Sequence, residues 1–75
     1  METENIRKKN RELTKLRKLA GLTQRDVQLV TGNLINYTKM SCLENGYFLP
    51  TDEEAQALAE AFKVSKEEII DTFKS

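Results

Sequence analysis

The chain has 75 residues, one cysteine, no histidine and a formal net charge of zero. This length suits a single domain with one small core, and a lone cysteine excludes an internal disulfide. Without histidine, His-based catalysis and the usual His-containing zinc sites are excluded. No apolar run approaches the length of a membrane span and no secretory signal is evident, so we expect a cytoplasmic protein without membrane contact.

The charges are unevenly distributed along the chain. Residues 1–47 hold nine Lys/Arg against five Asp/Glu, whereas residues 48–75 hold three against seven. The first part is therefore basic and the second acidic, which suits an anionic partner for the first part. A solvated helix surface explains the same asymmetry without a partner, and both interpretations stay open at this point.

The first predicted element is a long amphipathic helix from Asn5 to about Ala20, after a frayed start over residues 1–4. Its apolar residues recur at helical spacing, and basic side chains cover the remaining surface. The apolar set is Ile6, Leu13, Leu16 and Ala20. Gly21 is a natural helix end, because glycine tolerates the left-handed conformation.

Residues 23–46 predict two short helices joined by a polar turn. Thr23 and Asp26 form a capping-box pattern at the start of the first, and Gly32-Asn33 ends it. Its inner face is predicted to carry Val27, Val30 and, in part, Leu29.

The second of these helices starts at Asn36, a good N-cap, and Asn45-Gly46 ends it. Only Ile35, Met40 and Leu43 are expected to face inward. This leaves on its outer surface Tyr37, Thr38, Lys39, Ser41 and Cys42. Such a rigid helix with polar tips is what reading base edges in the DNA major groove requires.

Two further capping boxes, Thr51 to Glu54 and Ser65 to Glu68, predict the last two helices. Their apolar positions are Ala55, Leu58, Ala59 and Phe62 in the first and Ile69, Ile70 and Phe73 in the second. No segment has the pattern of a strand. We therefore predict an all-α fold, a compact five-helix domain spanning residues 1–75.

The same residues argue against an enzyme. The acidic pairs Glu53/Glu54 and Glu67/Glu68 lie in first helical turns, where free N–H groups stabilise negative charge. Cys42 has no histidine to activate it, and no phosphate-binding glycine loop is present. We expect no catalytic residue, no metal and no cofactor.

Taken together, several segments resemble the Cro/CI-type (XRE-like) helix-turn-helix DNA-binding family. The segments that carry the resemblance are Leu13-x-x-Leu16-Arg17, Gly21-Leu22-Thr23-Gln24, Ile35-Asn36, Leu43-Glu44-Asn45-Gly46, Pro50-Thr51, Leu58-Ala59-x-Ala61-Phe62 and Val64-Ser65 with Ile69. Each is weak alone, but their order and spacing make a specific signal. The resemblance implies a repressor-like fold in which helices two and three form the helix-turn-helix.

The resemblance also implies roles for individual positions. The residues expected to contact DNA are Gln24, Arg25, Asn36, Tyr37, Thr38, Lys39, Ser41, Cys42, Asn45 and Tyr47. Gln24 is expected to contact a DNA phosphate, and Lys39 a phosphate or a base. Asn45 and Tyr47 are expected to contact the DNA backbone. Each of two residues has a structural alternative to contact with DNA. Tyr37 could brace the turn instead, and Cys42 could fill a gap in the packing. Arg17 and Glu44 are expected to form a structural pair between the first helix and the recognition helix.

The chain departs from the family pattern in four ways. Asn33 and Leu34 lengthen the turn by two residues, which predicts a displaced or tilted recognition helix. Gln28 replaces a small residue at the helix crossing, which predicts a wider separation of the two helices. Lys63 stands where glycine is usual, and the recognition helix lacks Arg and Gln.

We therefore expect a sequence-specific transcriptional regulator of the repressor or Cro type, from a phage, mobile element or bacterium. It would bind a palindromic operator in double-stranded DNA as a homodimer, because one recognition helix reads few base pairs. Ile70 and Phe73 are the candidate dimer contacts, and Phe73, two residues from the end, is the better of the two. Core packing is the alternative, above all for Ile70. The competing hypothesis is a protein-interaction module on the same fold, suggested by the apolar run Tyr47-Phe48-Leu49.

Overall fold

The computed structural model describes residues 9–74, which contain five α-helices and no strand. The helices are α1 (Arg11–Leu19), α2 (Gln24–Val30), α3 (Tyr37–Glu44), α4 (Asp52–Phe62) and α5 (Lys66–Asp71). The predicted all-α, five-helix architecture is confirmed. The predictions for residues 1–4 and for helix at residues 5–8 lie outside the described part of the chain.

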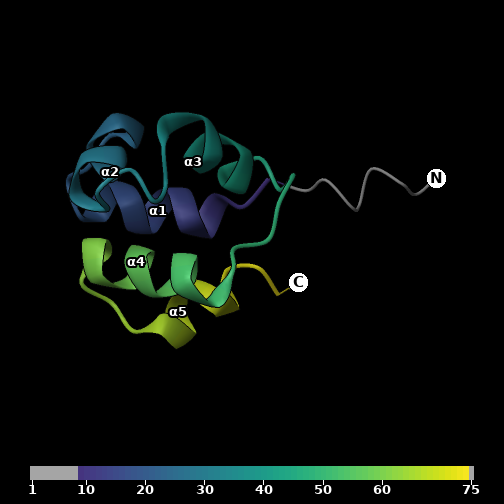
Figure 1. Cartoon of the computed structure of the whole chain (residues 1–75). Coiled ribbons are helices and arrows are strands. Elements are labelled where there is room, and N and C mark those ends of the chain that lie inside the picture. The colour runs from purple at the N-terminus through teal and green to yellow at the C-terminus, as the bar shows by residue number, and fades with distance from the viewer. Residues whose placement is uncertain (1–8, 75) are drawn as a thin grey trace.

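The helices pack in two pairs joined by α1. Helix α2 packs on α3 and α4 packs on α5, while α1 contacts both α3 and α4. Figure 1 shows α2 and α3 on one side of the bundle and α4 and α5 on the other, with α1 between them. The buried core joins all five helices and consists of Leu13, Val27, Ile35, Met40, Leu43, Ala55, Leu58, Ala59, Phe62 and Ile69. Burial of these apolar side chains is the main favourable term in folding.

The helix boundaries follow the local signals in the sequence. All three predicted capping boxes form, at Thr23/Asp26, Thr51/Glu54 and Ser65/Glu68. In each box the side-chain hydroxyl accepts from a backbone N–H three residues later, which satisfies a donor that the helix leaves unpaired. Gly21 and Gly46 follow α1 and α3 with φ of +77° and +79°, as their predicted helix-ending roles require.

The start of α1 differs from the prediction. Within the described residues the helix begins at Arg11, whereas Lys9 and Asn10, predicted to be helical, are not. Asn10 instead acts as the N-cap, with its side-chain oxygen 3.0 Å from the backbone nitrogen of Leu13. Its backbone nitrogen donates to the Glu44 carbonyl at 2.8 Å, and its Nδ2 donates to Thr72 Oγ1 at 3.0 Å. Asn10 therefore leaves helical geometry because it ties α1 to the ends of α3 and α5.

The inner face of α2 is narrower than predicted. Val27 is fully buried, but Leu29 and Val30 are 75% and 56% exposed. The prediction was wrong for these two residues. Helix α2 has only seven residues, and Val30 at its end lines the open groove beside α4 instead of the core.

The apolar residues predicted for α4 are all buried in the core, and in α5 Ile69 is fully buried. Ile70 is exposed and Phe73 packs partly against the core, so the two predicted dimer contacts differ in accessibility. Lys63 follows α4 with φ of +61°, in the left-handed conformation that usually favours glycine.

Candidate nucleic-acid interface

The outer surface of α3 is the polar face predicted for a recognition helix. Met40 and Leu43 on its inner side are fully buried in the core, as is Ile35 just before the helix. Tyr37 and Thr38 are exposed, and Ser41 and Cys42 are half-buried beside them. Asn36 caps the helix by accepting from the Lys39 backbone nitrogen at 2.7 Å. One side of α3 therefore anchors the helix, while the other offers hydroxyl, thiol and phenol groups to solvent.

Two residues of α2 hold the first residue of α3. The side-chain oxygen of Gln28 accepts from the backbone nitrogen of Tyr37 at 2.9 Å. The guanidinium carbon of Arg25 lies 5.3 Å from the centre of the Tyr37 ring, in cation–π contact. The ring is thus partly engaged within the protein and partly exposed, so the bracing role and the DNA role considered for Tyr37 are compatible.

Arg17 and Glu44 lie in direct contact, as the resemblance implied for a structural pair. Arg17 Nε lies 2.6 Å from Glu44 Oε2, and both side chains are about nine-tenths buried. Thr14 Oγ1 donates to Glu44 Oε1 at 2.9 Å and Gln24 Nε2 donates to the same oxygen at 3.1 Å. Arg17 Nη1 also donates to the Leu22 carbonyl at 2.8 Å. The Glu44 carboxylate therefore joins α1 and α2 to the C-terminal end of α3.

Two residues expected at the DNA are bound to acidic side chains of the protein. Gln24 donates to Glu44, as above, and Lys39 Nζ lies 2.8 Å from Glu54 Oε2. Burial raises the pKa of the Glu54 carboxyl, but hydrogen bonds from Lys39 and Thr51 outweigh it and hold this pKa below its usual value. The lysine charge thus fastens α3 to α4, and a phosphate contact would require it to leave or share this carboxylate.

The loop after α3 holds the two remaining predicted contacts. Asn45 Nδ2 donates back to the Ser41 carbonyl at 2.8 Å, which closes the helix. Tyr47 is exposed, as are its neighbours Phe48 and Leu49. The apolar run on which the interaction-module hypothesis rests therefore lies at the surface.

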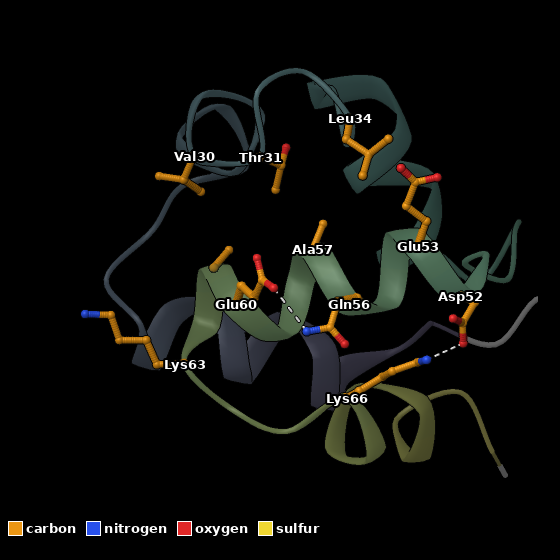
Figure 2. A pocket seen from close by; sticks show the side chains of 11 residues that line it. Val30, Thr31, Leu34, Asp52, Glu53, Gln56, Ala57, Glu60, Lys63 and Lys66 are labelled. Atoms are coloured by element: carbon orange, nitrogen blue, oxygen red, sulfur yellow. Dashed lines mark hydrogen bonds and ion pairs between the residues drawn. The ribbon is translucent and has the colours of Figure 1, made fainter.

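A groove of about 890 Å³ opens between the α2–α3 turn and α4 (Figure 2). Val30 and Leu34 line one side of it, and α4 contributes Ala57 and acidic side chains on the other. The carboxylates that line it are Asp52, Glu53 and Glu60. Asp52 is paired with Lys66. Lys63 and Lys66 also line the groove, so its three carboxylates face two cations and it has no excess of positive charge to attract phosphate.

The sequence alone missed four residues that position α3. Asn10, Thr14, Gln28 and Glu54 were not predicted to contact α3, and each does so through a hydrogen bond or ion pair. A partial signal existed only for Gln28, which was noted as unusual at the helix crossing. The other three are ordinary cap or surface residues by local pattern.

Among residues 9–74, no cluster of metal-binding side chains occurs, and no helix there is long and apolar enough to cross a membrane.

A helix-turn-helix family model matches residues 13–69. Comparisons with curated proteins and with solved structures gave no significant match.

Proposed function

The chain belongs to the XRE-like helix-turn-helix family of DNA-binding domains, and we propose that it is a sequence-specific transcriptional regulator with α3 as its recognition helix. The match covers about three quarters of the chain and includes all of α2 and α3. The family is one of DNA-binding domains rather than of enzymes. The proposal goes further, to a small repressor or Cro-type protein that reads a defined operator.

The observation that carries the proposal is the two-sided character of α3. Its apolar residues are fully buried, so the helix is rigidly held, and its opposite side presents Tyr37, Thr38, Ser41 and Cys42. Threonine offers a methyl group to thymine and a hydroxyl to other base edges. Base contacts of this kind specify sequence, whereas cationic and amide side chains position the protein on phosphates.

Arg25 is the cation best placed for a phosphate contact beside this face. It is exposed and held over the Tyr37 ring at the start of α3. The other proposed contacts to the DNA backbone rest on family position alone. They are Gln24, Asn36, Asn45 and Tyr47. Lys39 is the weakest of the proposed contacts, because Glu54 already neutralises it.

We further propose that two copies bind a palindromic operator. One α3 covers few base pairs, and two related helices about 34 Å apart would read both half-sites. Ile70, rather than the Phe73 favoured from the sequence, is the better candidate for the contact between copies, because Ile70 is exposed while Phe73 is partly packed against the core.

The test is selection of bound duplexes from a random-sequence library, followed by gel shifts on the enriched sequence over a salt series. We expect an enriched palindrome and affinity that falls steeply with salt. Arg25→Ala should reduce the salt slope by about one, and Thr38→Ala should relax preference at one base position. Gln56→Ala, on the outer surface of α4, is the control and should change neither. No enrichment and no retardation at micromolar protein would refute the proposal.

A second candidate function is a protein-interaction module on the same fold, such as an antirepressor or corepressor. The observation that favours it is the exposed run Tyr47, Phe48 and Leu49, of which Leu49 is 75% exposed. Exposed apolar patches commonly mark interaction sites. This function predicts no salt-sensitive retardation of any duplex, so the same experiment separates the two candidates.

A further inference from the structure

The connection between α2 and α3 is held by hydrogen bonds from Thr31 and Gln28. The helices are separated by residues 31–36, and Gly32 and Asn33 both have positive φ, at +62° and +71°. A left-handed non-glycine residue carries a conformational cost, so the surrounding contacts must maintain this turn. Thr31 braces its middle by accepting from the Ile35 backbone nitrogen at 3.2 Å and donating to the Val27 carbonyl at 2.7 Å.

Gln28 contacts both the middle of this turn and the helix start that follows it. Its backbone carbonyl accepts from the Asn33 nitrogen at 2.9 Å, and its side-chain oxygen accepts from the Tyr37 nitrogen, also at 2.9 Å. The Tyr37 N–H is one of the donors that the start of a helix leaves unpaired within the helix. Asn36 satisfies the donor on Lys39, and Gln28 reaches from α2 to satisfy this one.

Arg25 acts on the same residue from the same face of α2. Residues three apart on a helix are surface neighbours, so Arg25 and Gln28 stand side by side. Gln28 fixes the Tyr37 backbone, and Arg25 lies over its ring. Tyr37 is therefore set by two contacts from α2, one on the main chain and one on the side chain.

We propose that Gln28 is a positioning residue that sets the orientation of the start of α3, and with it the sequence preference of Tyr37 and Thr38. This inference rests on the proposed DNA-binding function. The apolar contacts of Ile35, Met40 and Leu43 hold α3 against the core, but apolar packing has little directionality. A hydrogen bond to the first N–H of the helix is directional and fixes how the exposed residues point.

The contact between Gln28 and Tyr37 lies at the end of the longer turn. The sequence predicted that Asn33 and Leu34 would displace or tilt the recognition helix, and that Gln28 would hold the two helices further apart. In the structure the Gln28 side chain spans from α2 to α3 and accepts from the Tyr37 nitrogen. The large side chain at the crossing therefore supports the helix start that follows the longer turn.

The first part of the test uses the protein alone and follows hydrogen exchange of the Tyr37 amide by NMR. Gln28→Ala and Gln28→Met remove the acceptor, and Gln28→Met keeps most of the side-chain length. Gln28→Glu retains an acceptor oxygen and should rescue protection. Gln56→Ala is the matched control, since Gln56 also makes one side-chain hydrogen bond, to Glu60 at 3.1 Å. We expect exchange about tenfold faster in the two acceptor-free variants only, corresponding to one hydrogen bond.

The second part measures the ratio of specific to non-specific DNA affinity, at one salt concentration and a temperature at which all variants are folded. The duplexes are the sequence enriched by the wild type and a scrambled version of it. We expect both acceptor-free variants to lose roughly tenfold in this ratio with non-specific affinity unchanged, an effect that lower stability alone would not produce.

The outcomes separate this inference from the function on which it rests. If the wild type selects a sequence and the acceptor-free variants keep its full selectivity, or keep Tyr37 protected, the positioning role is overturned and the DNA-binding proposal stands. If the wild type selects no sequence, the DNA-binding proposal fails and the selectivity role fails with it.

Discussion

Removal of Arg17 should destabilise the domain more than any exposed charge substitution. Glu44 is 8% exposed, and Arg17 is its only cationic partner within the described residues, at 2.6 Å. Arg17→Met replaces the arginine by an apolar side chain of similar length. The Glu44 carboxylate is then left with two neutral donors, on Thr14 and Gln24. An uncompensated buried charge of this kind costs about 3 kcal/mol.

This loss is large relative to the stability of so small a domain. By the usual stability per residue, a 75-residue chain has roughly 4 to 11 kcal/mol in total. For a domain of this size about 3 kcal/mol corresponds to a fall in Tm of roughly 12 to 24 °C. Thermal and urea unfolding followed by circular dichroism measure both quantities.

Two further variants make the result specific to the buried pair. Lys66→Met removes the cation from the more exposed pair with Asp52, and it should cost less than about 1 kcal/mol. Glu44→Gln combined with Arg17→Met removes both charges, so the double variant should regain about 1 to 2 kcal/mol over Arg17→Met alone. A cost below about 1 kcal/mol for Arg17→Met, with no recovery in the double variant, would refute this reasoning.

Three further substitutions test other features of the fold. Asn10→Ala should cost about 2 kcal/mol in urea unfolding because it removes the α1 cap and the bond to Thr72, whereas Asn10→Asp, which keeps the cap acceptor, should cost less. Lys63→Gly should raise stability by about 0.5 to 1 kcal/mol by relieving the left-handed residue, and Lys63→Ala should give no gain. Because the folded-state pKa of Glu54 is depressed, its ionised form stabilises the domain above the ordinary value of 4.5, and this contribution is lost as pH falls through the lower folded value. The urea midpoints of wild type and Glu54→Gln should therefore differ at neutral pH and converge in acid; a constant difference would contradict the assignment.

The sequence by itself determined the helices and most of the core. Capping boxes such as Thr23/Asp26 act between residues three apart, so the pattern contains both partners. Gly21 and Gly46 end helices because of a local backbone preference. The inward set of α3 followed from its spacing, and the family resemblance followed from the order of such local signals.

The tertiary structure alone decided how α3 is held. The bonds from Gln28 to Tyr37, from Lys39 to Glu54 and from Asn10 to Thr72 join residues 9, 15 and 62 positions apart. No local pattern contains both partners of such a bond, because the partners meet only after the helices pack. For the same reason periodicity placed Val30 inside, although no helix covers it. Spacing predicts which residues share a face of a helix, but packing decides which faces are covered and which side chains meet across them.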